Sequence, residues 1–305
     1  MTQGLAYVVS SGSDRIDVLE LPALRVVGRL AAGDWPLTAV ALPGGAVAVA
    51  NQASDDVRVL DATSGALLHR LPTERGAAGL AVAPARHLLF VANEFARSVQ
   101  TFDTLDFTPR GRFEPGDCPC VVAVTPDERL ALVANEESDT LALYDLDAAE
   151  VVARVPVAGG PVGVAVSPDG RLALCGSLLS PRLTVVDLAA RRVVVERRVG
   201  SMHIGVLILE DGVHGVCGNT DADTVLVVRL ADLGVVRTIR VGAGPATLRQ
   251  VPGTPLVLCT NRTDDSVSLV DVEAGVERAR RGVGLSPTGI ALASDAHARG
   301  AEAAS

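Results

Sequence analysis

Short apolar runs rich in Val and Leu alternate with turn residues along nearly the whole chain. Residues 163–175 carry two such runs, GVAVS and RLALC, joined by a Ser-Pro-Asp-Gly turn, and two more follow at 183–188 and 192–199. Runs of about five residues, with turns only a few residues long between them, are typical of β-strands. No segment keeps a helical period of apolar residues long enough to predict a helix. The pattern therefore predicts short strands, four to a unit, and little else.

The units repeat in register, because particular residue types recur every 42 positions. One column reads Asn51, Asn93, Asn135, Ser177, Asn219 and Asn261. A second reads Asp61, Asp103, Asp145, Asp187, Arg229 and Asp271, and a third reads Pro119, Pro161, His203, Pro245 and Pro287. We interpret the Asn and Asp columns as turn residues whose side chains bond nearby backbone groups. Four-stranded repeats of about 40–45 residues are typical of propeller blades.

The ends of the repeat predict how the ring closes. The chain enters at the second strand of a unit, residues 5–10, and residues 288–294 form a first strand with no unit of its own. Pairing these two strands leaves no open sheet edge. We predict an all-β, seven-bladed β-propeller with four antiparallel strands per blade, a single domain over residues 1–294, closed by 288–294. We expect residues 295–305 to be a mobile tail.

Residues 133–174 resemble the repeat of YVTN-type propeller proteins. They run from Asn-Glu-Glu-Ser-Asp-Thr to Gly-Gly-Pro-Val-Gly-Val-Ala-Val-Ser-Pro-Asp-Gly. The resemblance covers about residues 5–294 and implies the propeller fold. The superfamily includes surface proteins, binding proteins, lactonase-like enzymes and haem-binding domains, so the resemblance implies no single activity.

Composition and charge argue against some classes of binding partner. The formal net charge is −9 and every cationic side chain other than His is Arg, with no Lys. Such a surface disfavours nucleic acid and anionic membranes, since both bind through clusters of basic residues. The N-terminal segment lacks a basic region followed by an apolar stretch, and five Cys, an odd number in a large chain, argue against a disulfide framework. We expect a cytoplasmic monomer.

The loops between second and third strands and the crossovers between blades are expected to surround one mouth of the central channel. Residues there that break the repeat are candidates for ligand binding: Trp35, Phe95, Cys118, Cys120, Leu178, Leu179, Met202 and His203. Apolar walls with a few polar anchors are typical of pockets for small organic molecules. A closed, well-packed mouth with a surface His is the alternative. If the pocket exists, His203→Pro, which restores the repeat, is expected to leave folding intact and remove binding.

Two chemical roles remain open at this mouth. His203 is a candidate acid or base because imidazole titrates near neutral pH, with Glu136 as its candidate partner; Glu94, Glu137 and Asp117 also lie in mouth loops. The thiols of Cys118 and Cys120 are soft metal ligands, but no spacing rule joins them to the Met-His pair, so we predict no metal and no cofactor.

The sequence favours a noncatalytic binding module that recognises a small organic molecule or a protein segment at the channel mouth. The alternative is a lactonase-like hydrolase or a lyase that uses His203. An enzyme requires a second titratable group within hydrogen-bond reach of His203.

Overall fold

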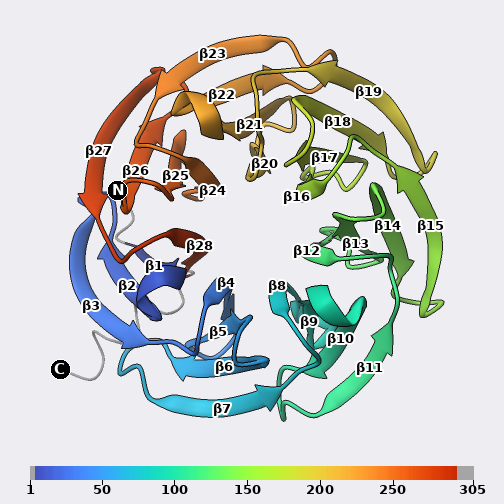
Figure 1. Ribbon diagram of the computed structural model, residues 1–305, viewed down its shortest axis with the longest axis vertical. Helices are drawn as coiled ribbons and strands as arrows, with labels where there is room; N and C mark the ends of the chain where they lie inside the picture. The colour runs from blue at the N-terminus through green and yellow to red at the C-terminus, as the bar shows by residue number, and fades with distance from the viewer. Residues whose placement is uncertain (1–3, 294–305) are drawn as a thin grey trace.

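Seven four-stranded antiparallel sheets stand around a central channel in the computed structural model, which describes residues 4–293 (Figure 1). This confirms the predicted seven-bladed propeller. The expected tail, 295–305, lies outside the described residues. Between residues 4 and 293, no helix has the length and apolar character needed to cross a membrane.

We number the blades from the sheet that contains the N-terminal strands. Blade 1 contains β28 (Pro287–Leu292), β1 (Leu5–Ser10), β2 (Arg15–Glu20) and β3 (Arg25–Ala31). Blade 2 contains β4 (Pro36–Leu42), β5 (Ala46–Asn51), β6 (Asp56–Asp61) and β7 (Leu67–Pro72). Blade 3 contains β8 (Ala77–Ala83), β9 (Leu88–Asn93), β10 (Ser98–Asp103) and β11 (Pro109–Phe113). Blade 4 contains β12 (Pro119–Val124), β13 (Leu130–Asn135), β14 (Thr140–Asp145) and β15 (Glu150–Pro156).

The remaining blades follow the same order. Blade 5 contains β16 (Pro161–Val166), β17 (Leu172–Ser177), β18 (Arg182–Asp187) and β19 (Arg192–Arg198). Blade 6 contains β20 (Val206–Ile208), β21 (His214–Asn219), β22 (Thr224–Arg229) and β23 (Val235–Arg240). Blade 7 contains β24 (Pro245–Gln250), β25 (Leu256–Asn261), β26 (Ser266–Asp271) and β27 (Val276–Gly282). Short 3-10 turns lie at η1 (Ser11–Ser13), η2 (Pro84–Arg86), η3 (Glu94–Ala96) and η4 (Thr220–Ala222).

The ring closes as predicted, through the pairing of β28 with β1. The two strands are antiparallel, with Ala6 opposite Leu292 and Val9 opposite Gly289. β28 therefore supplies the innermost strand of blade 1, while β1 to β3 supply the other three. The first and last strands of the described chain share one sheet, which leaves no sheet in the ring without its inner strand.

The repeated Asn and Asp side chains hold each blade together, as the sequence indicated. Asn51 is fully buried; its Oδ1 accepts a hydrogen bond from the Gly33 backbone N–H at 2.9 Å, and its Nδ2 donates to the Val49 carbonyl at 3.2 Å. Asp61 Oδ1 accepts from the Thr63 and Ser64 backbone N–H groups at the next turn. Such bonds satisfy buried backbone groups that the strand ladders leave unpaired.

Candidate functional site

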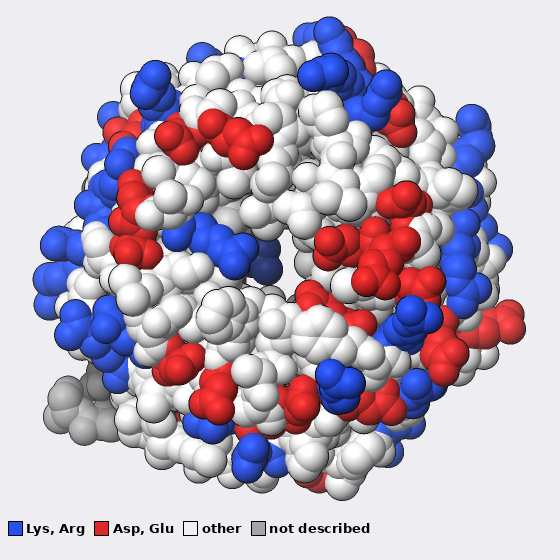
Figure 2. All heavy atoms as spheres, viewed as in Figure 1, with Lys and Arg blue, Asp and Glu red and all other residues white. Residues whose placement is uncertain are grey.

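The innermost strands of all seven blades enclose a central cavity of about 530 Å³. Its wall is built mostly from Ala, Val, Leu, Ile and Gly, and four charged side chains interrupt it: Glu94, Glu136, Arg249 and Arg262. Figure 2 views the molecule down the channel axis and shows the opening. An apolar wall with a few charged groups has the composition of a small-molecule site, and its volume lies in the range of about 300–1,000 Å³ that such sites occupy.

The loops at this mouth are fastened to the blade crossovers by a repeated hydrogen bond. The last residue of the loop between the second and third strands is usually an Asp in a left-handed backbone conformation. Asp55 Oδ1 accepts from the Gly76 backbone N–H at 2.7 Å, and Asp139 Oδ1 accepts from the Gly160 backbone N–H at 2.8 Å. The same bond recurs in blades 1, 6 and 7. The mouth is therefore a rigid frame on which variable side chains are held.

One of the variable positions forms a ring around the mouth. It is the residue after the Asn column, and the seven blades place there Ser11, Gln52, Glu94, Glu136, Leu178, Thr220 and Arg262. Blades 3 and 4 contribute carboxylates and blade 7 contributes a guanidinium. Figure 2 shows acidic side chains gathered on one side of the opening and basic side chains reaching toward it from the other. The mouth therefore carries opposite charges on opposite sides.

Arg249 is the one charged side chain from an innermost strand in the cavity wall. The equivalent positions in the other six blades carry Val40, Ala81, Ala123, Ala165, Leu207 and Ala291. Nη1 of Arg249 donates to the Leu248 carbonyl at 3.1 Å, and no ion pair joins its guanidinium within residues 4–293. Desolvation in the channel lowers the pKa of Arg249. Arg249 is half-buried, and desolvation of a cation without a counter-charge is costly, so an anionic group that approached this side chain would stabilise it.

The two carboxylates of the cavity wall, Glu94 and Glu136, come from adjacent blades and bond uncharged side chains. The Gln52 side-chain amide donates a hydrogen bond to the Glu94 carboxylate. Burial raises the pKa of Glu94 to about 7, the negative charge of Glu136 adds to the rise, and the Gln52 bond opposes it. Burial and the charge of Glu137 also raise the pKa of Glu136. Glu136 Oε2 accepts from the Cys118 thiol at a long 3.9 Å. Within residues 4–293, neither Glu94 nor Glu136 has an Arg or His partner.

The two mouth cysteines are held as neutral thiols. Burial raises the pKa of Cys118 to about 12, helped by the charges of Glu94, Glu136 and Glu137. Cys120 is buried, its Sγ lies 3.5 and 3.3 Å from the Ala134 and Pro161 carbonyl oxygens, and burial raises its pKa well above the usual range. Thiolates, not thiols, bind soft metals. Among the residues described, no group of three His, Cys, Asp or Glu side chains is arranged to hold a metal ion.

His203 does not face the mouth as the sequence-based hypothesis required. Its side chain is 0% exposed, Nδ1 contacts the Gly218 carbonyl at 3.0 Å, and Nε2 contacts the Val199 carbonyl. Its backbone N–H donates to the Ser177 carbonyl at 3.0 Å. In blade 6 the inner strand is reduced to three residues, and His203 belongs to the longer crossover that precedes it. In this position the ring has no exposed surface and both ring nitrogens lie against backbone carbonyls, so the imidazole does not reach a ligand at the mouth.

The other predicted residues divide between the cavity and its outer rim. Cys120 and Glu136 line the cavity. Trp35, Phe95 and Leu179 lie outside the cavity lining and are 46%, 58% and 74% exposed. The remaining residues, Cys118, Leu178 and Met202, are half-buried and also lie outside the lining.

Arg249 and Arg262 were not singled out from the sequence, although a signal was present. Both stand in 42-residue columns whose other members are uncharged or acidic. Glu94 was named only as a possible partner of His203, and the structure places it in the cavity wall without that partner.

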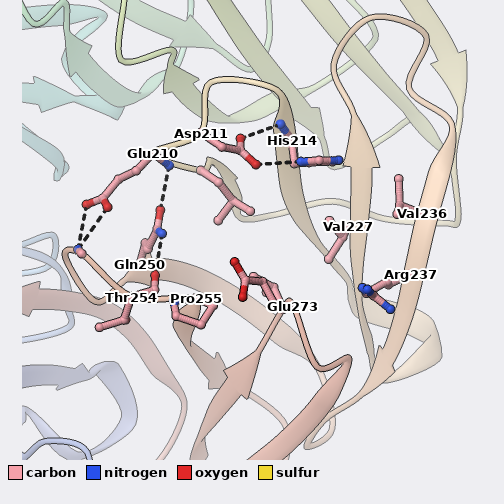
Figure 3. Close-up of a pocket in the computed structure, with 13 residues that line it drawn as sticks. Glu210, Asp211, His214, Val227, Val236, Arg237, Gln250, Thr254, Pro255 and Glu273 are labelled. Carbon is pink, nitrogen blue, oxygen red and sulfur yellow. Dashed lines mark hydrogen bonds and ion pairs between the residues drawn. The ribbon is translucent and has the colours of Figure 1, made fainter. Parts of the chain in front are cut away.

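A second hollow of about 490 Å³ lies between blades 6 and 7, at the end of the propeller opposite the mouth (Figure 3). His214 Nδ1 bonds Asp211 Oδ2 at 2.7 Å, and Asp211 Oδ1 accepts from the Val213 and His214 backbone N–H groups. Glu210 ties the two blades together by accepting from the Gly253 backbone N–H at 3.0 Å. Many of the polar groups here are bonded within the turns that they stabilise, so the central channel is the stronger candidate site.

Comparisons with known proteins agree with the fold. Residues 142–214 match the family described as YNCE-like beta-propeller. No curated protein sequence matches this chain. Among solved structures, hydrazine synthase of Kuenenia stuttgartiensis superposes with a TM-score of 0.76 at 19% identity, covering 84% of this chain and 89% of that one.

Two further structures are similar. A functionally unknown protein from Desulfotomaculum acetoxidans DSM 771 has a TM-score of 0.83 at 12% identity, covering 94% and 98% of the two chains. Dihydro-heme d1 dehydrogenase NirN, in complex with DHE, has a TM-score of 0.67 at 18% identity, covering 91% of this chain and 63% of that one. These likenesses establish that the chain has the fold of a seven-bladed β-propeller, with a YNCE-like segment over residues 142–214.

Proposed function

We propose that this protein is a noncatalytic binding module, related to the YVTN-type repeat propellers, that holds a small organic molecule in its central channel. The ligand enters by the mouth that carries Glu94, Glu136 and Arg262, and an anionic group on it contacts Arg249. The proposal moves the site from the exposed rim predicted from the sequence to the enclosed cavity just inside it.

The observation that carries the proposal is Arg249, which has no ion pair within residues 4–293 and is the one charged side chain that an innermost strand places in the largely apolar wall. Six of the seven equivalent positions are apolar, so the blade architecture does not need a guanidinium there. Arg presents a planar fork of donors that suits carboxylate and phosphate groups. The apolar wall around it gains by covering the hydrocarbon part of a ligand.

The catalytic alternative lacks its principal residue. A hydrolase or lyase that uses His203 requires an accessible imidazole, and this one is enclosed by backbone carbonyls. A protein segment is a less suitable ligand than a small molecule, because the charges lie inside a closed ring of seven sheets. The channel therefore supports binding of a small molecule better than either alternative.

Calorimetric titration with octanoate tests the proposal. The Arg249→Leu variant introduces the residue that blade 6 carries at Leu207, so the blade is expected to fold. A charge-assisted hydrogen bond contributes about 1.5–3 kcal/mol, so the variant is expected to bind octanoate about ten- to a hundredfold more weakly.

The matched control is Arg237→Leu, which removes an exposed guanidinium from the hollow at the opposite end. It is expected to bind octanoate as the wild-type protein does. Equal octanoate binding by wild-type and Arg249→Leu proteins, both shown to be folded by circular dichroism, would overturn the proposal.

A further inference from the structure

We propose that the channel ligand is an elongated zwitterion, with a carboxylate at one end and an ammonium group at the other, joined by an apolar spacer. Its carboxylate contacts Arg249 and its ammonium group contacts Glu94 and Glu136. This inference rests on the proposed function and specifies the chemical class of its ligand.

The positions of the blades place these charges across the channel from one another. Blade 7 packs against blades 6 and 1 through its inner strand β24, and blades 3 and 4 are neighbours through β8 and β12. In a ring of seven blades, the pair 3 and 4 is therefore the pair farthest from blade 7. Glu94 and Glu136 come from that pair, and Arg249 and Arg262 come from blade 7. The charge distribution in Figure 2 agrees with this arrangement.

Arg249 and the two carboxylates also lie at different depths along the channel. Pro245 begins β24 at the mouth, so Arg249, near the other end of that strand, lies deep in the channel. Glu94 and Glu136 belong to loops at the mouth itself. A ligand that meets both groups must extend along and across the cavity, and the Val, Ala and Leu wall between them suits a hydrocarbon spacer.

The charges are not neutralised by the protein within residues 4–293. Glu94 bonds the neutral Gln52, Glu136 contacts the neutral Cys118, and Arg249 bonds a backbone carbonyl. Elsewhere on the same rim, by contrast, Asp117 forms an ion pair with Arg97 at 3.2 Å. Two adjacent carboxylates without a cation repel each other, and an ammonium group between them removes that repulsion.

These side chains are also dispensable for building a blade. Glu94 and Glu136 share their position with Ser11, Gln52 and Thr220, which are neutral, and the blades containing those residues have the same four strands. Their charge is therefore a local addition to the scaffold. The neutral variants Glu94→Gln and Glu136→Gln are expected to fold, because Gln52 shows that the position accepts this side chain.

The test compares three probes of equal chain length by calorimetry: ω-aminooctanoate, octanoate and octylamine. At about pH 8 the zwitterion is expected to bind at least about tenfold more tightly than either singly charged probe, since it gains a charge-assisted contact at each end. A series of ω-amino acids from about four to about twelve carbons is expected to show one optimal length, because the two contacts lie at a fixed separation.

Separate variants test the contact at each end of the ligand. The double variant Glu94→Gln/Glu136→Gln is expected to reduce ω-aminooctanoate affinity to that of octanoate, without weakening octanoate itself. Arg249→Leu is expected to reduce ω-aminooctanoate affinity to that of octylamine. Glu273→Gln, in the hollow at the opposite end, is the matched control and is expected to change neither.

The outcomes distinguish this inference from the proposed function. If no ω-amino acid in the series binds more tightly than its carboxylate counterpart, while Arg249→Leu still weakens octanoate, the zwitterion inference is wrong and the channel remains a carboxylate site. If Arg249→Leu leaves the binding of octanoate and of every ω-amino acid unchanged, both proposals are wrong. A zwitterion advantage that persists in the Glu94→Gln/Glu136→Gln variant also overturns the inference.

Discussion

Gln52 and Glu94 occupy the same position in successive repeats, and the side-chain amide of Gln52 donates a hydrogen bond to the carboxylate of Glu94. The bond joins blades 2 and 3 at the channel mouth. It favours the ionised form of Glu94, yet burial and the charge of Glu136 outweigh it and raise the pKa of Glu94 to about 7. The carboxyl group therefore changes charge near neutral pH, unlike an ordinary surface Glu.

The raised pKa predicts how stability depends on pH. The folded protein binds the Glu94 proton more tightly than the unfolded chain does, so the contribution of this group to stability is greatest at low pH. It declines as pH rises from the ordinary value of 4.5 to about 7. Glu94→Gln removes the decline. We expect the free energy of unfolding of the variant, relative to wild type, to rise by up to about 3 kcal/mol between about pH 4 and about pH 8.

Urea unfolding at a series of pH values measures this difference. The groups that face Glu94 are Gln52, Glu136 and the Cys118 and Cys120 thiols. Glu273→Gln, on the far side of the molecule, is the control and is expected to follow the wild-type curve. Parallel stability curves for Glu94→Gln and wild type would show that Glu94 ionises as it does in water.

Ligand binding is expected to follow the same titration. Glu94 must be ionised to attract an ammonium group, so the advantage of ω-aminooctanoate over octanoate grows as pH rises through about 7. The affinity for octanoate falls or stays constant over the same range, because the added negative charge lies at the mouth. Calorimetric titrations at about pH 6 and about pH 8 measure both affinities. A zwitterion advantage that is largest at the lower pH would contradict the assignment of Glu94.

The structure reverses the expectation for His203→Pro. Proline removes the N–H that bonds the Ser177 carbonyl and both contacts of the imidazole to the Gly218 and Val199 carbonyls. Counting the backbone bond and one bond donated by the ring, each worth about 1 kcal/mol, we expect a loss of about 2 kcal/mol in the free energy of unfolding. The matched variant His203→Gln keeps the backbone N–H and one side-chain donor, and is expected to lose less. A His203→Pro protein as stable as wild type would show that these bonds contribute little.

The cysteines are expected to be unreactive in the folded protein. Burial raises the pKa of Cys118, Cys175 and Cys217 to about 12, and that of Cys120 and Cys259 is raised as well. Because thiolates are the reactive species, alkylation by iodoacetamide at about pH 8 should be at least about tenfold slower than in denaturant. Mass spectrometry after timed labelling measures the rate at each site. Fast labelling of Cys118 in the native protein would contradict the neutral-thiol assignment.

The closing strand is expected to be essential for stability. A chain that ends before β28, at about residue 285, lacks the inner strand of blade 1, leaves the edge of β1 unpaired and exposes the apolar neighbours of Ile290. That loss is comparable to the whole stability of a typical domain, about 5–15 kcal/mol. A chain that ends at Ala293 keeps β28 and is the matched control. Equal melting temperatures for the two chains would show that the ring does not depend on this strand.

The sequence predicted the fold because its evidence is distributed over many equivalent positions. The Asn column alone predicts where the second strand ends in six blades. In the structure, each residue of that column is the last residue of a strand. An error at one position, such as Ser177 in place of Asn, does not disturb the register. Blade count and closure therefore follow from periodicity, without knowledge of any single contact.

The site was harder to predict because it depends on the direction of individual side chains. His203 departs from a Pro column, but its ring is fully buried and the strand that follows, β20, is unusually short, neither of which the sequence pattern revealed. Arg249 lies within a strand, where a single polar residue is ordinarily interpreted as one that points away from the core. Comparison of its 42-residue column, in which the other residues are apolar, would have identified it.

The shared sheet of blade 1 also constrains the order in which the protein folds during synthesis. β1, β2 and β3 are made before the other six blades, but their innermost partner, β28, is made after all of them. Blades 2 to 7 are each contiguous in the chain and are able to pair as they emerge from the ribosome, whereas β1 must wait until all of them have been made. Throughout that interval β1 presents an unpaired apolar edge, which is prone to pair with other chains. The time before β28 is made is therefore the stage of synthesis at which the protein is most exposed to aggregation.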